Sequence, residues 1–192
     1  MRYGIFGGAF NPIHVGHVII AIRSMEYLKL EKLFIVPTYI PPHRSSDLAP
    51  FDLRMRWIEK AFEGIEGIEI SDYEFKKGGK SYSIETVEHF SNLLGEKPFF
   101  IIGEDWIGRI DTWYRFEDLR KMTTFAVYPR FRESVMDRFR DVYPDFVFME
   151  KLPLVEVSST EIRDRISKGL SVKGMVPDSI EKEVVSHYGV IT

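Results

Sequence analysis

The sequence predicts an α/β fold built on a single doubly wound parallel sheet, followed by C-terminal helices. Short apolar runs recur along the chain, and amphipathic segments of helical periodicity separate most of them. The strand-like runs are apolar throughout, as in sheets that are covered on both faces. All 192 residues fit one domain, with a helical segment from about residue 158, and are enough to bury a sizeable core.

The first strand and helix are predicted at the N-terminus. The apolar pair at 5–6 indicates a short buried strand that breaks into a turn at Gly7 and Gly8. From Val15 onward the spacing is helical, with Val18, Ile22 and Met25 on one face. A strand, a glycine turn and a helix in succession bring backbone N–H groups and a helix N-terminus together, which is a geometry that binds phosphate.

The rest of the chain continues the alternation. A buried strand is expected at 33–36, where Pro37 stops it, and Pro41 and Pro42 stiffen the loop that follows. Further strands are expected at 67–70, 98–103, 124–129 and 146–150, further helices at 52–64, 84–94, 133–142, 159–169 and 177–189, and a polar loop at 76–83. A functional site is expected at the carboxyl ends of the strands.

Composition excludes several classes of protein. The apolar fraction of 44% and the charged fraction of 29% are typical of soluble proteins, and no apolar run is long enough to span a membrane. No secretory signal is apparent, so a cytoplasmic location is expected. The absence of cysteine excludes disulfides, thiolate metal sites and a catalytic thiol. A net charge of -3 argues against general binding of nucleic acid, which needs excess positive charge.

One hypothesis for the stretch GIFGGAFNPIHVGH, residues 4–17, is that its glycines form a dinucleotide-binding fingerprint. That fingerprint needs glycines spaced G-x-G-x-x-G and an acidic residue near the end of the second strand. Here the turn reads G-x-x-G-G, and the second strand ends in Pro37 and Thr38. An oxidoreductase is therefore not indicated, whereas a phosphate site is.

His14 and His17 lie one helical turn apart at the expected helix entry, where both rings can face a phosphate or a metal. A metal is the weaker option, because neither a flanking Glu nor a nearby third His completes a ligand set. Alternatively, one histidine caps the helix and the other packs in the core. Gly16 between them favours a ligand, since it lets the ligand approach the backbone.

A second cluster is VSSTEIRDRI, residues 157–166. Ser158 and Glu161 have the spacing of a capping box, so a well-capped surface helix is one interpretation. Ser159 and Thr160 add hydroxyls at the helix N-terminus, and Arg163 follows one turn later. These donors suit a polyphosphate.

The motifs resemble those of a known superfamily. GGAFNPIHVGH is similar to the G-G-x-F-[DN]-P-x-H-x-G-H opening of the nucleotidyltransferases, and SSTEIR is similar to their [ST]-S-T-x-I-R element. Four more segments, PTYIPPHR, KSYSIETV, IIGEDWIGRIDTW and VPDSIEKEV, resemble in the same order segments of the bacterial nicotinate-nucleotide adenylyltransferases. The similarity runs from Tyr3 to about Tyr188, with Asn11 where Asp is frequent and Ser83 where Thr is frequent.

The resemblance implies a Rossmann-like fold and a reaction. Enzymes of this family transfer the adenylyl group of ATP to nicotinate mononucleotide with the help of Mg²⁺, giving deamido-NAD and pyrophosphate in NAD biosynthesis. The phosphate of the mononucleotide attacks in line, so no covalent enzyme intermediate is implied. Mg²⁺ would be held mainly by the substrate phosphates, without a dedicated protein motif.

The resemblance also assigns roles to residues. The residues implied to be catalytic are His14, His17 and Arg163. Those implied to bind ATP are Gly7, Gly8, Phe10, Gly16, Gly103, Ser159 and Thr160. Those implied to contact nicotinate mononucleotide are Tyr82, Ser83, Asp105, Trp113 and Tyr114. Without the resemblance, Trp113 would be interpreted as an ordinary core aromatic.

Two alternatives stay open. Another adenylyltransferase, such as one that acts on phosphopantetheine, would share both phosphate motifs but not KSYSIETV or GEDWIGRIDTW. A nucleotide-sensing module that has lost turnover would keep the fold, although His14, His17 and Arg163 are all present here.

Overall fold

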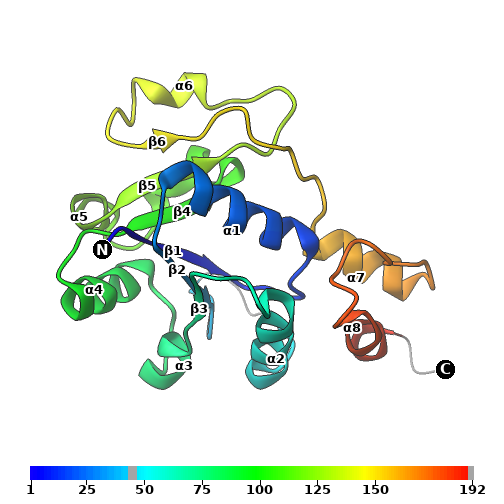
Figure 1. The fold of residues 1–192 in the computed structure, drawn as a ribbon. Coiled ribbons are helices and arrows are strands. Elements are labelled where there is room, and N and C mark those ends of the chain that lie inside the picture. The colour runs from blue at the N-terminus through cyan, green and yellow to red at the C-terminus, as the bar shows by residue number, and fades with distance from the viewer. Residues whose placement is uncertain (43–46, 190–192) are drawn as a thin grey trace.

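The strands of this computed structural model, which describes residues 1–42 and 47–189, form one parallel sheet (Figure 1). Residues 43 and 44, the end of the segment PTYIPPHR, lie outside the described residues. The strands are β1 (Tyr3–Gly8), β2 (Lys32–Pro37), β3 (Ile68–Ile70), β4 (Phe99–Gly103), β5 (Thr124–Tyr128) and β6 (Val147–Phe148), in the sheet order β3-β2-β1-β4-β5-β6. The predicted parallel sheet is confirmed.

Helices cover both faces of this sheet and bury two separate apolar cores. One face packs against α1 (Val15–Leu28), α2 (Phe51–Phe62), α7 (Ser159–Ser167) and α8 (Glu181–Tyr188). The other face packs against α4 (Ser83–Leu94), the 3₁₀ helix η1 (Glu104–Thr112), α5 (Phe116–Met122) and the region of α6 (Asp137–Arg140). In Figure 1, α4 and α5 lie on one side of the strands and α2, α7 and α8 on the other. The predicted doubly wound, Rossmann-like architecture is therefore confirmed.

The strand order reverses between β1 and β4, which are neighbours although β2 and β3 come between them in the chain. Pairing of β1 with β2 continues to Gly8 and Pro37, whereas pairing of β1 with β4 ends at Phe6 and Ile101. Beyond Phe6 the carboxyl ends of β1 and β4 are therefore not paired with each other. Open α/β sheets bind ligands at such a switch point.

The predicted turn at Gly7 and Gly8 is wrong. Strand β1 continues through Gly8, and the chain turns afterwards, where Phe10 has a φ of 45°. A Cβ atom on Gly8 would lie 3.2 Å from the ring of Phe10. Glycine is therefore needed here because the Phe10 ring folds back over the strand, and it does not itself form the turn.

Helix α1 is confirmed, and it begins at Val15 as predicted. The buried residues of this helix are Gly16, Ile20, Ala21, Ser24 and Leu28. The three residues of the predicted apolar face, Val18, Ile22 and Met25, are partly buried, and Val18 and Met25 pack against the core. Ala21 and Ser24 are small residues with no exposed surface, and a pattern of large apolar residues does not identify such buried positions.

Several short elements also differ from the predictions. Helix α3 (Tyr73–Lys77) takes up the start of the predicted polar loop, and neither η1 nor α5 was predicted. The expected helix at 133–142 is reduced to α6, and the strand at 146–150 is reduced to β6. Such short helices depend on packing against the rest of the protein more than on their own periodicity. Within the described ranges, no helix is long and apolar enough to cross a membrane.

Candidate functional site

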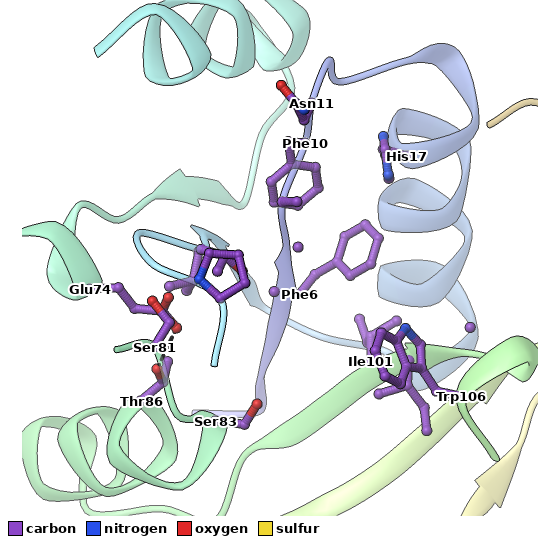
Figure 2. Close-up of a pocket in the computed structure, with 18 of the residues that line it drawn as sticks. Phe6, Phe10, Asn11, His17, Glu74, Ser81, Ser83, Thr86, Ile101 and Trp106 are labelled. Carbon is purple, nitrogen blue, oxygen red and sulfur yellow. Dashed lines mark hydrogen bonds between the residues drawn. The ribbon is translucent and has the colours of Figure 1, made fainter. Parts of the chain in front are cut away.

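A cavity of about 640 Å³ opens at the carboxyl ends of β1, β2 and β4 (Figure 2). Most of the predicted site residues line it: Gly7, Gly8, Phe10, His17, Tyr82, Ser83, Gly103, Asp105, Trp113, Tyr114, Ser159 and Arg163. They come from β1, α1, α4, β4, η1 and α7, and from the segments that join these elements. The fold thus brings together segments that are far apart in the sequence.

The predicted residues that are not on the cavity wall are His14, Gly16 and Thr160. A Cβ atom on Gly16 would lie 2.9 Å from the His14 ring and from Val155, so the absence of a side chain makes room for these two residues. The Thr160 hydroxyl accepts a hydrogen bond from Arg163 at 3.3 Å. His14 is 2% exposed and lies behind His17.

The two histidines form a stacked pair at the start of α1. Their ring centroids lie 3.7 Å apart, and the backbone N–H of His14 donates to Nδ1 of His17 at 3.2 Å. His17 therefore caps the helix, and it also lines the cavity, next to the rings of Phe6 and Phe10. Since Nδ1 of His17 accepts a hydrogen bond, Nε2 carries the proton in the neutral ring and is a donor for an anion.

Burial keeps both imidazoles neutral near pH 7. It lowers the pKa of His14 to about 3, and the positive charge of Arg130 acts in the same direction. Burial also lowers the pKa of His17 well below its ordinary value, with smaller contributions from His14 and Arg130. His17 consequently presents a hydrogen-bond donor to the cavity without carrying a full positive charge.

The first turn of α7 is tied to the turn that follows β1. The Ser158 hydroxyl accepts from the backbone N–H of Glu161 at 3.1 Å, which confirms the predicted N-cap. The Ser159 hydroxyl donates to the carbonyl of Pro12 at 2.8 Å, and Nη1 of Arg163 donates to the carbonyl of Asn11 at 2.5 Å. Ser159 and Arg163 therefore hold the turn in place while they also line the cavity.

The side chain of Asn11 uses both its acceptor and its donor within the protein. Its Oδ1 accepts from the backbone N–H of Ala49 at 2.9 Å and from the Tyr188 hydroxyl at 2.5 Å, and its Nδ2 donates to the carbonyl of Asp47 at 3.2 Å. An aspartate at this position would lack the donor to Asp47. The amide thus joins β1, the segment before α2 and the C-terminal helix α8.

The opposite end of the cavity is aromatic. The rings of Tyr82 and Tyr114 lie 4.5 Å apart, and Ser83 is the first residue of α4. Trp113 packs edge-on against Phe100 with centroids 5.9 Å apart. Trp113 therefore packs against the core, as the interpretation as an ordinary core aromatic expects, and it also lines the cavity.

Sequence reasoning missed a polar group that Figure 2 shows across the cavity from His17. Glu74 is 7% exposed, and its carboxylate accepts from the Thr86 hydroxyl at 2.8 Å. The Ser81 hydroxyl accepts from the backbone N–H of Tyr39 at 2.9 Å. Burial raises the pKa of Glu74, against the effect of these neighbouring donors. Thr86 could have been found from helical spacing, because it lies three residues after Ser83 on the same face of α4. Glu74 lies on the short helix α3, for which the sequence carried no signal.

Arg130 was also missed, although it lies two residues after the end of the buried strand β5. It lines the cavity, and its guanidinium lies 3.8 Å from the carboxylate of Asp105. Its side chain packs over Gly103, since a Cβ atom there would lie 3.0 Å from Cδ of Arg130 and collide with Asp105. A basic residue that follows a strand at the carboxyl edge of the sheet is the signal that could have identified it.

The donors around His17 suit an anion better than a metal ion. This end of the cavity is lined by the neutral His17, by Arg130 and by Arg163. Among the described residues, no group of three His, Cys, Asp or Glu side chains could hold a metal ion.

Comparisons with known proteins agree with this geometry. The cytidylyltransferase-like family model matches residues 5–165. A protein from Thermotoga maritima named probable nicotinate-nucleotide adenylyltransferase is 46% identical over 192 residues, which cover 98% of this chain and 93% of the relative. A protein of the same name from Thermosipho melanesiensis is 40% identical over 189 residues, covering 96% and 95% of the two chains.

Among solved structures, Plasmodium falciparum nicotinic acid mononucleotide adenylyltransferase complexed with NaAD matches with a TM-score of 0.80. The alignment covers 97% of this chain and 95% of that chain at 19% sequence identity. At this identity the match supports the fold, and it agrees with the parallel sheet described above.

Proposed function

The chain belongs to the nicotinate-nucleotide adenylyltransferases, within the cytidylyltransferase-like family, and on this premise we propose that it transfers the adenylyl group of ATP to nicotinate mononucleotide. The products would be deamido-NAD and pyrophosphate. One observation carries the proposal: a single cavity joins an anion-binding end, with His17, Arg130 and Arg163, to an aromatic end at Trp113 and Tyr114. Two nucleotides that meet through their phosphates need such a site.

We propose that the phosphate of the mononucleotide attacks the α-phosphorus of ATP in line, without a covalent enzyme intermediate. The chain has no cysteine, and the proton of the Ser159 hydroxyl is already donated to Pro12. Catalysis would then consist of positioning both phosphates and stabilising the charge that develops on their oxygens.

His17 is proposed to touch the reacting phosphate, and His14 to act through it. Nε2–H of His17 would donate to an oxygen on the α-phosphate, because Nδ1 is occupied by the backbone N–H of His14. His14 itself does not line the cavity. It would orient the His17 ring by stacking rather than bind the same oxygens.

The remaining phosphates would lie against Arg163 and the N-terminal turn of α7, where backbone N–H groups favour an anion. Gly7 and Gly8 would let ATP lie close to the end of β1, beside Phe10. Mg²⁺ would enter bound to phosphate oxygens and water, and it would neutralise part of their charge.

The aromatic end is proposed to bind the pyridine ring. Trp113 would stack on the ring, and the backbone N–H groups of Ser83 and Tyr114 would donate to the carboxylate. Tyr82 and Asp105 also line the cavity and would contact the ring and the ribose. Backbone donors of this kind favour a carboxylate over an amide, because an amide NH₂ would face another donor.

The test is an acceptor panel. The protein is incubated with ATP and Mg²⁺ together with nicotinate mononucleotide, nicotinamide mononucleotide or phosphopantetheine, and pyrophosphate release is measured. The proposal expects release with nicotinate mononucleotide and little without an acceptor. Release with phosphopantetheine instead would identify a different adenylyltransferase. ATP binding without turnover on any acceptor would identify a sensing module.

A further inference from the structure

Glu104 is a buried carboxylate that no step of the proposed reaction uses. It is 1% exposed and begins η1, directly after β4. All of its hydrogen bonds in the structure come from the segment 130–135, which follows β5. A buried carboxylate is costly unless donors surround it, so this interaction holds two segments together.

The donors form two pairs, one on each carboxylate oxygen. Oε2 accepts from the backbone N–H of Arg130 at 2.8 Å and of Phe131 at 3.3 Å. Oε1 accepts from the Ser134 hydroxyl at 2.6 Å and from the backbone N–H of Val135 at 2.6 Å. Burial alone raises the pKa of Glu104, but these donors outweigh it and hold the pKa below its ordinary value. The carboxylate is therefore ionised near neutral pH.

This anchor lies directly beside the cavity. Gly103 and Asp105, the neighbours of Glu104 in the sequence, both line the cavity, and so does Arg130. The backbone of Arg130 is bound to Glu104, and its guanidinium lies 3.8 Å from Asp105. By holding the backbone of Arg130, Glu104 determines the position from which this side chain extends. The positive charge of Arg130 lies on the side of the cavity where it lowers the pKa of His14 and His17.

We propose that Glu104 is a positioning residue that holds the segment 130–135 against the end of β4 and thereby places the Arg130 guanidinium on the substrate phosphates. Glutamine has nearly the same shape, but it offers one carbonyl oxygen where the carboxylate offers two. Two donors face each oxygen of the carboxylate, so the NH₂ group of a glutamine would lie opposite one of these two pairs of donors. Glu104→Gln should therefore release part of the segment without removing a side chain from the core.

The first measurement is hydrogen exchange on the whole protein, and it does not depend on the proposed function. In Glu104→Gln, the amides of Arg130, Phe131 and Val135 should exchange at least tenfold faster than in the unmutated protein. The matched control is Thr123→Val, which removes a buried hydrogen bond to Pro98 near the amino end of β5. This control should leave exchange at 130–135 unchanged. Unchanged exchange in Glu104→Gln would refute the anchor.

The second measurement rests on the proposed function and is a double-mutant cycle. Glu104→Gln and Arg130→Ala should each lower kcat/KM by roughly 10- to 100-fold, as expected when a charged contact to phosphate is lost. The double variant should lose little more than Arg130→Ala alone, because Glu104 acts through Arg130. Thr123→Val should keep the unmutated kcat/KM.

The outcomes separate the two proposals. Additive losses in the double variant would show that Glu104 does not act through Arg130, and would overturn the inference. If the unmutated protein transfers no adenylyl group to any acceptor, the proposed function fails. The cycle is then carried out on ATP binding measured by calorimetry, where the same non-additivity is expected, and additive losses again overturn the inference.

Discussion

The ring of His14 stacks on the ring of His17 with a centroid distance of 3.7 Å and an angle of 27° between the planes. One of these rings is buried behind the cavity and the other lines it. Because protonating either ring would place a charge in a poorly solvated position next to Arg130, both remain neutral. The pair therefore presents a donor of fixed orientation to the cavity, without a titration near neutral pH.

Replacing His17 with alanine should lower kcat by roughly two to three orders of magnitude, the range typical of removing one preorganised donor to a transition-state oxygen. The fold should survive, since the side chain is only partly buried. Steady-state kinetics and thermal unfolding measure the two effects separately. His187→Ala, at an exposed histidine of α8, is the control and should keep full activity. If His17→Ala lost stability but the folded fraction kept its activity, His17 would be a cap only.

The free energy of unfolding should fall as the pH falls below about 6.5. The pKa of His14 is about 3 in the folded protein and near 6.5 in the unfolded chain, so between these values the unfolded chain binds the additional proton. Each pH unit in this window should cost up to ~1.4 kcal/mol through His14. Urea unfolding at pH 5 and pH 8 measures the difference. In His14→Phe the dependence should be weaker, and parallel curves for the two proteins would contradict this account.

Removing the hydroxyl of Tyr188 should affect the active site from the C-terminal helix. Tyr188→Phe would lose the hydrogen bond to Asn11, at a cost of about 1 kcal/mol in unfolding free energy, and would loosen the turn after β1. We expect kcat/KM for ATP to fall several-fold. Tyr3→Phe is the matched control, because it removes a hydroxyl that donates to the carbonyl of Glu96, away from the cavity. Equal kinetic effects in both variants would indicate a general loss of stability.

The protein should prefer nicotinate mononucleotide over its nicotinamide counterpart by about tenfold to a few thousandfold in kcat/KM. An amide would leave a buried donor unpaired at the proposed backbone N–H groups of Ser83 and Tyr114, and such a group costs on the order of 1–3 kcal/mol. Since these donors belong to the backbone, Ser83→Ala should keep most of the preference. Trp113→Ala should weaken the binding of both substrates. Loss of selectivity in Ser83→Ala would show that the assignment is wrong.

Local sequence signals were sufficient for much of the fold. The apolar runs of β1, β2, β4 and β5 and the longer helices α1, α2 and α4 were all expected near their observed positions. Each of these elements is long enough to show its characteristic spacing of apolar residues. Helix α5 has seven residues and begins after Arg115, which has a φ of 53°, so it had no comparable pattern. Its place depends on packing of Phe116 and Leu119 in the core.

By itself, the sequence indicated the class of the sheet and, through short motifs, part of the cavity wall, because apolar periodicity and motifs are read from residues that are close together in the chain. Only the tertiary structure decided that His14 lies behind His17, that Asn11 binds Tyr188, and that Glu104 anchors the segment of Arg130. The links from Asn11 to Tyr188 and from Glu104 to the segment of Arg130 join residues that are far apart in the chain. Pairing of β4 with β5 up to Gly103 and Tyr128 brings Glu104 to the segment after β5, and such pairing leaves no periodic signal in either segment.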